Sequence, residues 1–125
     1  DDARRRDRLR VAYRLLHRRG ETLFRRLWDG LADVAGVTLY GPPPGTPRTP
    51  TLGFTIAGVR PRDAAGRLAE RGLFLSTGDF YATSVIDRLG LRDRGGLLRA
   101  GIVAYTTGTE IDRLIDGVAE LARTA

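Results

Sequence analysis

The segment that most constrains the fold is LLRAGIVAYTTGTEIDRL, residues 97–114. Its first part, Leu97–Ala104, is apolar except for one arginine and predicts a β-strand. Thr107 and Glu110 then have the spacing of a capping box, in which the two side chains satisfy free backbone donors at the start of a helix. Apolar residues follow at helical spacing: Ile111, Leu114, Ile115, Val118, Leu121 and Ala122. We therefore expect a strand followed by a terminal helix.

Upstream of this segment, the first half of the chain predicts a helix, a loop and two strands. Residues from Arg4 to Ala35 carry apolar side chains at three- and four-residue steps, as one long amphipathic helix does, and Gly36 would end that helix. Val37–Tyr40 is a short strand candidate. The proline-rich segment Gly41–Pro50 predicts a surface loop, because proline removes a backbone donor and fixes φ. Thr51–Ile56 alternates apolar and polar residues, which indicates a half-buried strand.

The middle of the chain predicts shorter elements. Pro61 suits the first turn of a helix that Gly72 would end. We expect Leu73–Leu75 as a brief buried strand, Ser76–Asp79 as a turn and Ala82–Leu89 as a short helix. Together the elements predict an α+β fold, a small, mainly antiparallel sheet with helices packed on one face.

Length and composition indicate one domain with a modest core, since the chain has 125 residues, 42% of them hydrophobic and 29% charged. We expect a single domain over residues 1–125, with a long connecting helix at 1–35 and an α+β layer at 36–125. Because the sequence contains no methionine and opens at Asp1, we expect a processed product, an excised domain or a fragment.

Absent residue types exclude several kinds of chemistry. The sequence contains no cysteine, which excludes disulfides, thiolate zinc sites and a cysteine nucleophile within these residues and favours a cytoplasmic location. No stretch approaches the ~20 apolar residues that cross a bilayer, and none has the pattern of a secretory signal, so we expect no membrane partner. All 21 basic residues are arginine. Without lysine, no side chain here can form a Schiff base with an aldehyde cofactor.

The net charge of +6 raises nucleic acid as a partner. Residues 1–30 hold ten arginines against five acids and so carry +5 of that charge, while the other 95 residues are nearly balanced. The basic helix lacks the interleaved aromatics of nucleic-acid folds and is typical of a solvated face. We therefore expect no specific nucleic-acid partner. Val11 and Leu15 interrupt the arginine face of this helix.

Arg99 is the first candidate site residue. It lies in the apolar strand between Leu98 and Ala100, where burying a guanidinium is costly unless it has a partner. Its planar fork of donors suits a carboxylate. The alternative is an arginine on the solvated face of a half-buried strand, and spacing alone favours that alternative.

The segment STGDFYA, Ser76–Ala82, is the second candidate. A glycine beside small hydroxyl and acidic residues, followed by two aromatics, is typical of a binding loop on a rigid scaffold. Ser76, Asp79 and Tyr81 are the polar candidates within it. The alternative is that Phe80 and Tyr81 are core anchors where the loop turns into a helix.

Two further residues, Tyr105 and His17, are candidates for a site. Tyr105 ends the Arg99 strand and either reaches the same pocket or caps the core. His17 has no companion at metal-ligand spacing, so we expect it on the surface and expect no metal site.

The sequence resembles a known family. Leu97–Leu114 resembles the end of class V pyridoxal-phosphate enzymes, where an arginine in the strand precedes a Tyr-Asn-Thr step and an acidic helix start. AERGLFLSTGDFYA at Ala69–Ala82 resembles the loop before that strand. GVTLYGPP at Gly36–Pro43 and RTPTLGFTIAGV at Arg48–Val59 resemble the opening of the small domain. The resemblance covers essentially the whole chain in collinear order, and it is to the aminotransferase class V and cysteine-desulfurase-like enzymes of fold type I.

The resemblance implies a carboxy-terminal small domain of such an enzyme. In that family the small domain closes over a site built mainly by a larger domain, which supplies the Schiff-base lysine and holds pyridoxal phosphate. Arg99 matches the family arginine that holds the α-carboxylate of an amino-acid substrate. The implied partners are an amino acid, the missing large domain and a second copy in a homodimer. No catalytic or cofactor-binding residue carries over, so the chain alone is expected to be inactive. The expected substrate-binding residues are Arg99, Ser76, Asp79, Tyr81 and Tyr105.

Some positions depart from the family pattern. Tyr81 stands where desulfurases have a reactive cysteine, which excludes persulfide chemistry at this loop. Ser76 replaces the family arginine before Thr-Gly, and Thr106 replaces the asparagine after the tyrosine. The implied reaction is transamination, an amino-acid lyase step or racemisation. The alternatives to an enzyme domain are a stand-alone basic module that binds RNA or an acidic protein, and a non-catalytic remnant.

Overall fold

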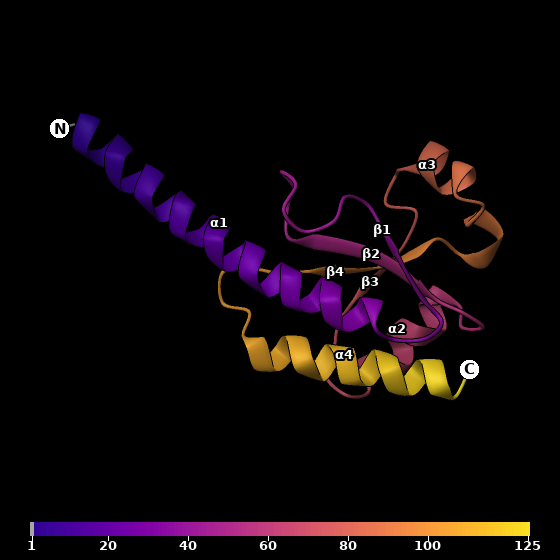
Figure 1. Cartoon of the computed structure of the whole chain (residues 1–125). Coiled ribbons are helices and arrows are strands. Elements are labelled where there is room, and N and C mark those ends of the chain that lie inside the picture. The colour runs from indigo at the N-terminus through magenta and orange to yellow at the C-terminus, as the bar shows by residue number, and fades with distance from the viewer. Residues whose placement is uncertain (1) are drawn as a thin grey trace.

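The computed structural model describes residues 2–125, so Asp1, the first residue of the expected domain, lies outside the described residues. The elements follow one another as α1 (Asp2–Ala32), β1 (Val37–Tyr40), β2 (Thr51–Ile56), α2 (Pro61–Ala69), β3 (Ser76–Gly78), α3 (Thr83–Arg88), a 3₁₀ turn η1 (Arg92–Arg94), β4 (Leu97–Gly101) and α4 (Gly108–Arg123). The predicted α+β fold is confirmed (Figure 1).

The four strands form one antiparallel sheet in the order β1-β2-β4-β3. In the inner strand β2, Phe54 lies opposite Leu39 of β1 and opposite Leu98 of β4. Alternate residues of β2 and β4 point to the same side of the sheet and are buried there, as the alternation along residues 51–56 predicts. They are Leu52, Phe54, Ile56, Leu98 and Ala100.

Helices α1, α2 and α4 cover this buried side of the sheet, as predicted (Figure 1). Leu27 and Leu31 of α1, Leu68 of α2 and Val118 and Leu121 of α4 are all buried in the shared core. The short α3 lies beyond the other side of the sheet (Figure 1). We call that other side, which faces away from α1, α2 and α4, the open side.

The predicted capping box at the start of α4 is present. The Thr107 hydroxyl accepts from the Glu110 backbone N–H at 3.2 Å, and a Glu110 carboxylate oxygen accepts from the Thr107 backbone N–H at 2.8 Å. The Glu110 carboxylate accepts hydrogen bonds from the Thr107 backbone N–H and from the Thr107 hydroxyl. These bonds, the backbone one most of all, lower the pKa of Glu110 below its ordinary value. The box therefore fixes the point at which the chain enters α4.

Several predicted boundaries are wrong, most clearly around β3. Leu73–Leu75 is not a strand, because Leu73 and Leu75 pack against the core without a ladder partner and Phe74 is 83% exposed. The strand is Ser76–Gly78, predicted as part of a turn, and it pairs with β4 at the edge of the sheet. Polar residues suit such an edge, where one row of backbone groups meets solvent. The predicted helix 4–35 instead spans Asp2–Ala32, and β4 ends at Gly101.

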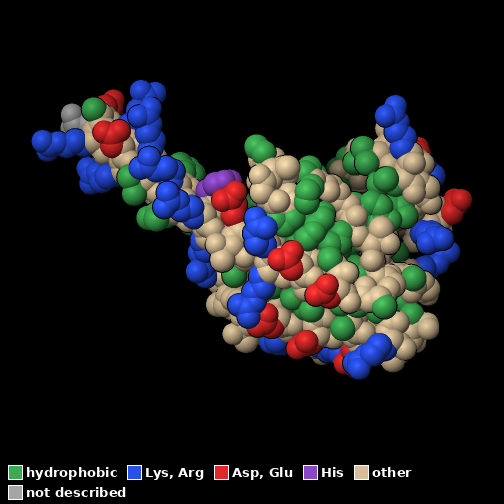
Figure 2. Space-filling model, in the orientation of Figure 1, with side chains coloured by type: hydrophobic (Ala, Val, Ile, Leu, Met, Phe, Trp, Pro, Cys, Tyr) green, Lys and Arg blue, Asp and Glu red, His purple; other side chains and the backbone are tan. Residues whose placement is uncertain are grey.

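The first half of α1 projects beyond the body of the domain (Figures 1 and 2). Every residue from Asp2 to Arg19 is exposed, and the first buried residue is Gly20. Arginines dominate this stretch, with apolar side chains among them (Figure 2). The large exposed apolar residues are Leu9, Val11, Tyr13, Leu15 and Leu16. Among the described residues, no helix combines the length and apolar character needed to cross a membrane.

We expect fast hydrogen exchange in the first half of α1 when the 125-residue chain is studied alone. Few tertiary contacts hold this half, whereas Leu23, Leu27 and Leu31 anchor the second half in the core. Exchange followed by mass spectrometry compares the two halves of one helix, so residues 23–31 serve as the internal control. Uniformly strong protection from Arg4 onward would contradict this expectation.

Candidate functional site

Arg99 lies on the open side of the sheet. It stands in β4 between the buried residues Leu98 and Ala100, so strand alternation turns its side chain away from the core into solvent. Its ladder partners are Ser76 of β3 on one flank and Gly53 of β2 on the other. Among residues 2–125, no carboxylate forms an ion pair with its guanidinium. Arg99 is therefore an exposed cation beside the candidate loop, without an internal ion pair. A role in binding a ligand requires this arrangement.

The residues after β3 form a strained turn. The φ angles are +125° at Gly78, +53° at Phe80 and +61° at Tyr81. The left-handed conformation costs a non-glycine residue about 1–2 kcal/mol. A carboxylate oxygen of Asp79 accepts from the Tyr81 backbone N–H at 3.1 Å, and the Asp79 carbonyl accepts from the Ala82 backbone N–H at 2.8 Å. Asp79 thus uses its side chain to hold the turn.

The turn places Phe80 against Arg99. The guanidinium carbon of Arg99 lies 4.0 Å from the centroid of the Phe80 ring, well inside the ~6 Å range of a cation–π contact. Phe80 is only half-buried, and Tyr81 is fully exposed at 101%. The alternative that Phe80 and Tyr81 are core anchors is therefore wrong. The Phe80 contact was missed from the sequence, because it depends on a left-handed backbone that residue types do not reveal.

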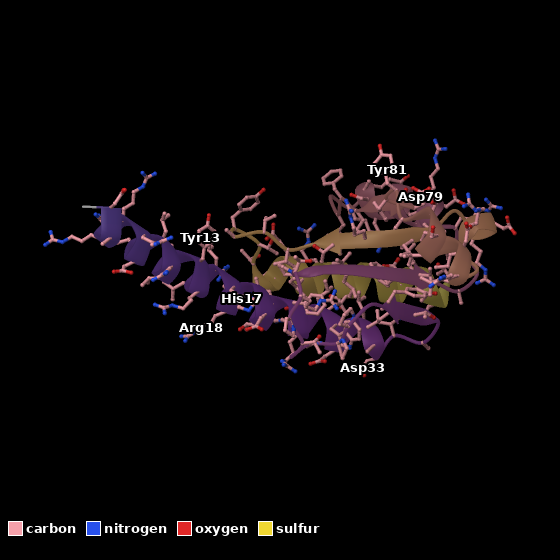
Figure 3. The ribbon with its side chains drawn as sticks, turned by 90° about the horizontal axis from the view of Figure 1, so that it is seen from above. Tyr13, His17, Arg18, Asp33, Asp79 and Tyr81 are labelled. Atoms are coloured by element: carbon pink, nitrogen blue, oxygen red, sulfur yellow. The ribbon has the colours of Figure 1, made fainter. Side chains whose placement is uncertain are left out.

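Four of the five expected site residues fall in one region. Ser76 is in β3, Arg99 is in the neighbouring strand β4, and Asp79 and Tyr81 are in the turn that joins β3 to α3. Figure 3 shows Asp79 and Tyr81 together, at the far end of the domain from Tyr13 and His17 of α1. Tyr105 is elsewhere. It is 83% exposed, so it does not cap the core, and it lines a separate hollow of about 410 Å³ whose lining does not include Arg99.

A larger hollow, of about 740 Å³, lies between α1, the loop 44–50 and residues 102–104. One of its cations is Arg48, whose guanidinium carbon lies 4.0 Å from the centroid of the Phe24 ring. Arg48 donates to the carbonyls of Thr49 and Thr51, at 3.2 and 2.6 Å, and burial lowers its pKa from the ordinary value. These hydrogen bonds brace the proline-rich loop, and the contact with Phe24 joins the loop to α1, so Arg48 has a structural role.

The last candidate from the sequence, His17, is a surface residue. His17 lies 3.4 Å from a carboxylate oxygen of Glu21, one turn further along α1, and is exposed as predicted. Within residues 2–125, no group of His, Cys, Asp and Glu side chains has the arrangement of a metal site. The exposed arginine at the open side of the sheet remains the strongest candidate for binding a ligand.

Comparison with known sequences identifies relatives over most of the chain. The profile of the family "Aminotransferase class-V" matches residues 10–114. A probable cysteine desulfurase of Methanothermobacter thermautotrophicus is 29% identical over 114 residues, which are 90% of this chain and 28% of that protein. A probable cysteine desulfurase of Streptomyces coelicolor is 31% identical over 88 residues, covering 70% of this chain and 20% of that protein. The chain thus spans between 20% and 28% of the length of these relatives.

Solved structures have the same fold over a similar portion. A cysteine desulfurase of Thermococcus onnurineus superposes with a TM-score of 0.85 and 24% identity, covering 96% of this chain and 29% of that one. The S-sulfonic acid form of an Escherichia coli cysteine desulfurase gives a TM-score of 0.73 and 28% identity, covering 84% of this chain and 25% of that one. With the family profile matching 105 consecutive residues, from 10 to 114, the chain belongs to the aminotransferase class V family.

Proposed function

We propose that this chain is the carboxy-terminal small domain of a pyridoxal-phosphate-dependent enzyme that acts on an amino acid. In this proposal Arg99 holds the α-carboxylate of the substrate. The observation that carries it is an exposed guanidinium on the open side of the sheet with no carboxylate partner among residues 2–125. A cation without an internal partner is available to a ligand.

The chemistry of the contact is straightforward. A guanidinium presents parallel N–H donors that match the two oxygens of a carboxylate. Binding the carboxylate at this point fixes the rest of the amino acid, including its amino group, relative to the enzyme. Ser76, the ladder partner of Arg99, adds a hydroxyl beside the same site. Tyr81, in the turn that carries Phe80, is fully exposed and so is also accessible to a ligand.

The residues of this chain do not fit the cofactor itself. Pyridoxal phosphate, when bound, withdraws electrons from an amino acid attached to it. That attachment starts from a lysine, and the sequence contains none. We therefore assign cofactor binding to the part of the enzyme outside these residues and assign only substrate binding to this chain.

Incubation of the 125-residue chain with pyridoxal phosphate, followed by borohydride reduction, is expected to leave no cofactor on any side chain. The reason is the absence of lysine, and labelling of the terminal amino group is the allowed exception. Peptide mass spectrometry locates any adduct, and a lysine-containing protein treated in parallel controls for the reduction. A stoichiometric adduct inside the chain would refute the assignment.

Desulfuration through the turn after β3 is not part of the proposal. The names of the relatives refer to cysteine desulfurases, but this sequence contains no cysteine, and Tyr81 stands at the position that carries the reactive cysteine in desulfurases of the resembled family. A tyrosine hydroxyl cannot form a persulfide. The enzyme is therefore proposed to process its amino acid without a sulfur nucleophile from this turn.

The exposed half of α1 is proposed to pack against the cofactor-binding part of the enzyme. Val11 and Leu15 lie one turn apart among arginines and are 45% and 61% exposed, whereas a fully solvated helix face is polar. Burying them would account for a helix that extends so far beyond its own domain (Figure 1).

Titration of the isotope-labelled chain with N-acetyl-L-alanine tests the carboxylate site directly. NMR shift changes are expected at Arg99, Ser76 and Tyr81, and Arg99→Gln is expected to abolish them because glutamine carries no charge. Arg62→Gln, which removes an exposed arginine on the helix side of the sheet, is the matched control and should bind like the wild type. Unchanged binding by Arg99→Gln would overturn the proposed role.

A further inference from the structure

The turn that carries Phe80 is held by several independent contacts. Two successive residues with side chains, Phe80 and Tyr81, adopt left-handed φ angles. Within the turn, the Asp79 side chain accepts from the Tyr81 backbone N–H, and the Asp79 carbonyl accepts from the Ala82 backbone N–H. From outside, the Gly96 backbone packs so closely on the Gly78 carbonyl that a Cβ at position 96 would overlap it. Strain of this kind persists only where the surroundings determine it, and it concentrates at functional sites.

The product of this strain is the stack of Phe80 on Arg99. The guanidinium carbon of Arg99 lies over the Phe80 ring, 4.0 Å from its centroid. A stacked ring uses the face of the cation and leaves its N–H donors, which lie in the guanidinium plane, free for a ligand. An exposed arginine without such a contact would sample many rotamers, and a ligand would have to order it on binding.

We propose that Phe80 is a positioning residue for Arg99. It holds the guanidinium in one orientation on the open side of the sheet, so that a carboxylate meets the two-pronged edge of a preorganised cation. The proposal rests on the proposed carboxylate-binding function of Arg99 and adds the residue that orients it. Tyr81, the other left-handed residue, is fully exposed and takes no part in the stack.

The test uses ring-removing and ring-keeping variants of the 125-residue chain. Phe80→Leu keeps an apolar side chain at the same φ but removes the ring, while Phe80→Tyr keeps the ring. Phe80→Asn removes the ring with a residue that tolerates left-handed φ, and so covers the case in which Phe80→Leu folds poorly. Phe74→Leu makes the same change at an exposed phenylalanine before β3 and is the matched control.

Two readouts separate positioning from general structure. The Arg99 Nε–H resonance should show a ring-current shift that is lost in Phe80→Leu and Phe80→Asn and retained in Phe80→Tyr. The Kd for N-acetyl-L-alanine should rise about two- to fivefold in the variants without the ring, the range expected for an exposed cation–π contact. Phe80→Tyr and Phe74→Leu should bind like the wild type.

The outcomes distinguish this inference from the function on which it rests. If Arg99→Gln abolishes binding and both ring-removing variants bind like the wild type, the positioning role is overturned and the carboxylate site stands. If Arg99→Gln itself binds like the wild type, both proposals fail. Weakened binding that Phe80→Tyr does not show, together with loss of the Arg99 ring-current shift, supports the positioning role.

Discussion

Arg99→Ala in the enzyme that contains this chain is expected to lower kcat/KM for the amino-acid substrate about tenfold to a hundredfold or more. A hydrogen bond to a charged group contributes about 1.5–3 kcal/mol net, and each 1.4 kcal/mol corresponds to about a factor of ten. Cofactor binding should not change, because this chain contains no lysine to which the cofactor can be attached. Steady-state kinetics together with the cofactor absorbance measure the two effects separately.

Two variants define how this result is interpreted. Arg99→Lys should restore the rate only in part, because an ammonium cannot reproduce the two-pronged contact. Arg62→Ala removes an equal charge from the helix side of the sheet and should leave kcat/KM unchanged. Wild-type efficiency of Arg99→Ala would show that Arg99 is only a solvated residue of β4, the alternative that spacing alone favoured.

Phe54→Ala is expected to destabilise the domain by about 3–5 kcal/mol, the range for truncating a buried aromatic side chain. Phe54 is 0% exposed and stands in the inner strand β2, with Leu39 and Leu98 opposite it on the two neighbouring strands. Because a small domain has only about 5–15 kcal/mol of stability in total, much of it would be lost. Urea unfolding followed by circular dichroism measures the change.

Phe74→Ala is the control for that experiment. Phe74 is 83% exposed, and surface substitutions of this kind usually change stability by less than about 0.5 kcal/mol. The contrast between the two phenylalanines tests the placement of the core on one side of the sheet. Equal losses for the two variants would contradict that placement.

The parts of the fold that were predictable are those in which local chemistry and tertiary structure agree. Residues 51–56 alternate strictly and lie in the inner strand β2, where only one side faces the core. The Thr107–Glu110 capping box forms within four consecutive residues, so it needs no distant contact.

The parts that were not predictable depend on the neighbours of a residue. Leu73–Leu75 has the composition of a strand, but the ladder with β4 begins three residues later, at Ser76. The position of β4 decides which residues pair with it. That position depends on packing across the whole domain, which the local sequence at 73–78 does not contain. The contact between Phe80 and Arg99 joins residues 19 positions apart through a strained turn. The candidate site was therefore found through its arginine, and its aromatic partner was found only in the structure.

The continuity of α1 has a mechanical consequence. Its 31 residues contain no proline, and at about 1.5 Å per residue they form a rod of roughly 46 Å. Residues 2–18 extend about 26 Å beyond Arg19, whose guanidinium donates to the carbonyls of Ala104 and Thr106. Such a rod amplifies small rotations. A turn of the sheet by about 10° moves the far end of the helix by roughly 5 Å. A rotation of the sheet that carries Arg99 toward or away from a ligand therefore produces a larger displacement at the first turns of α1.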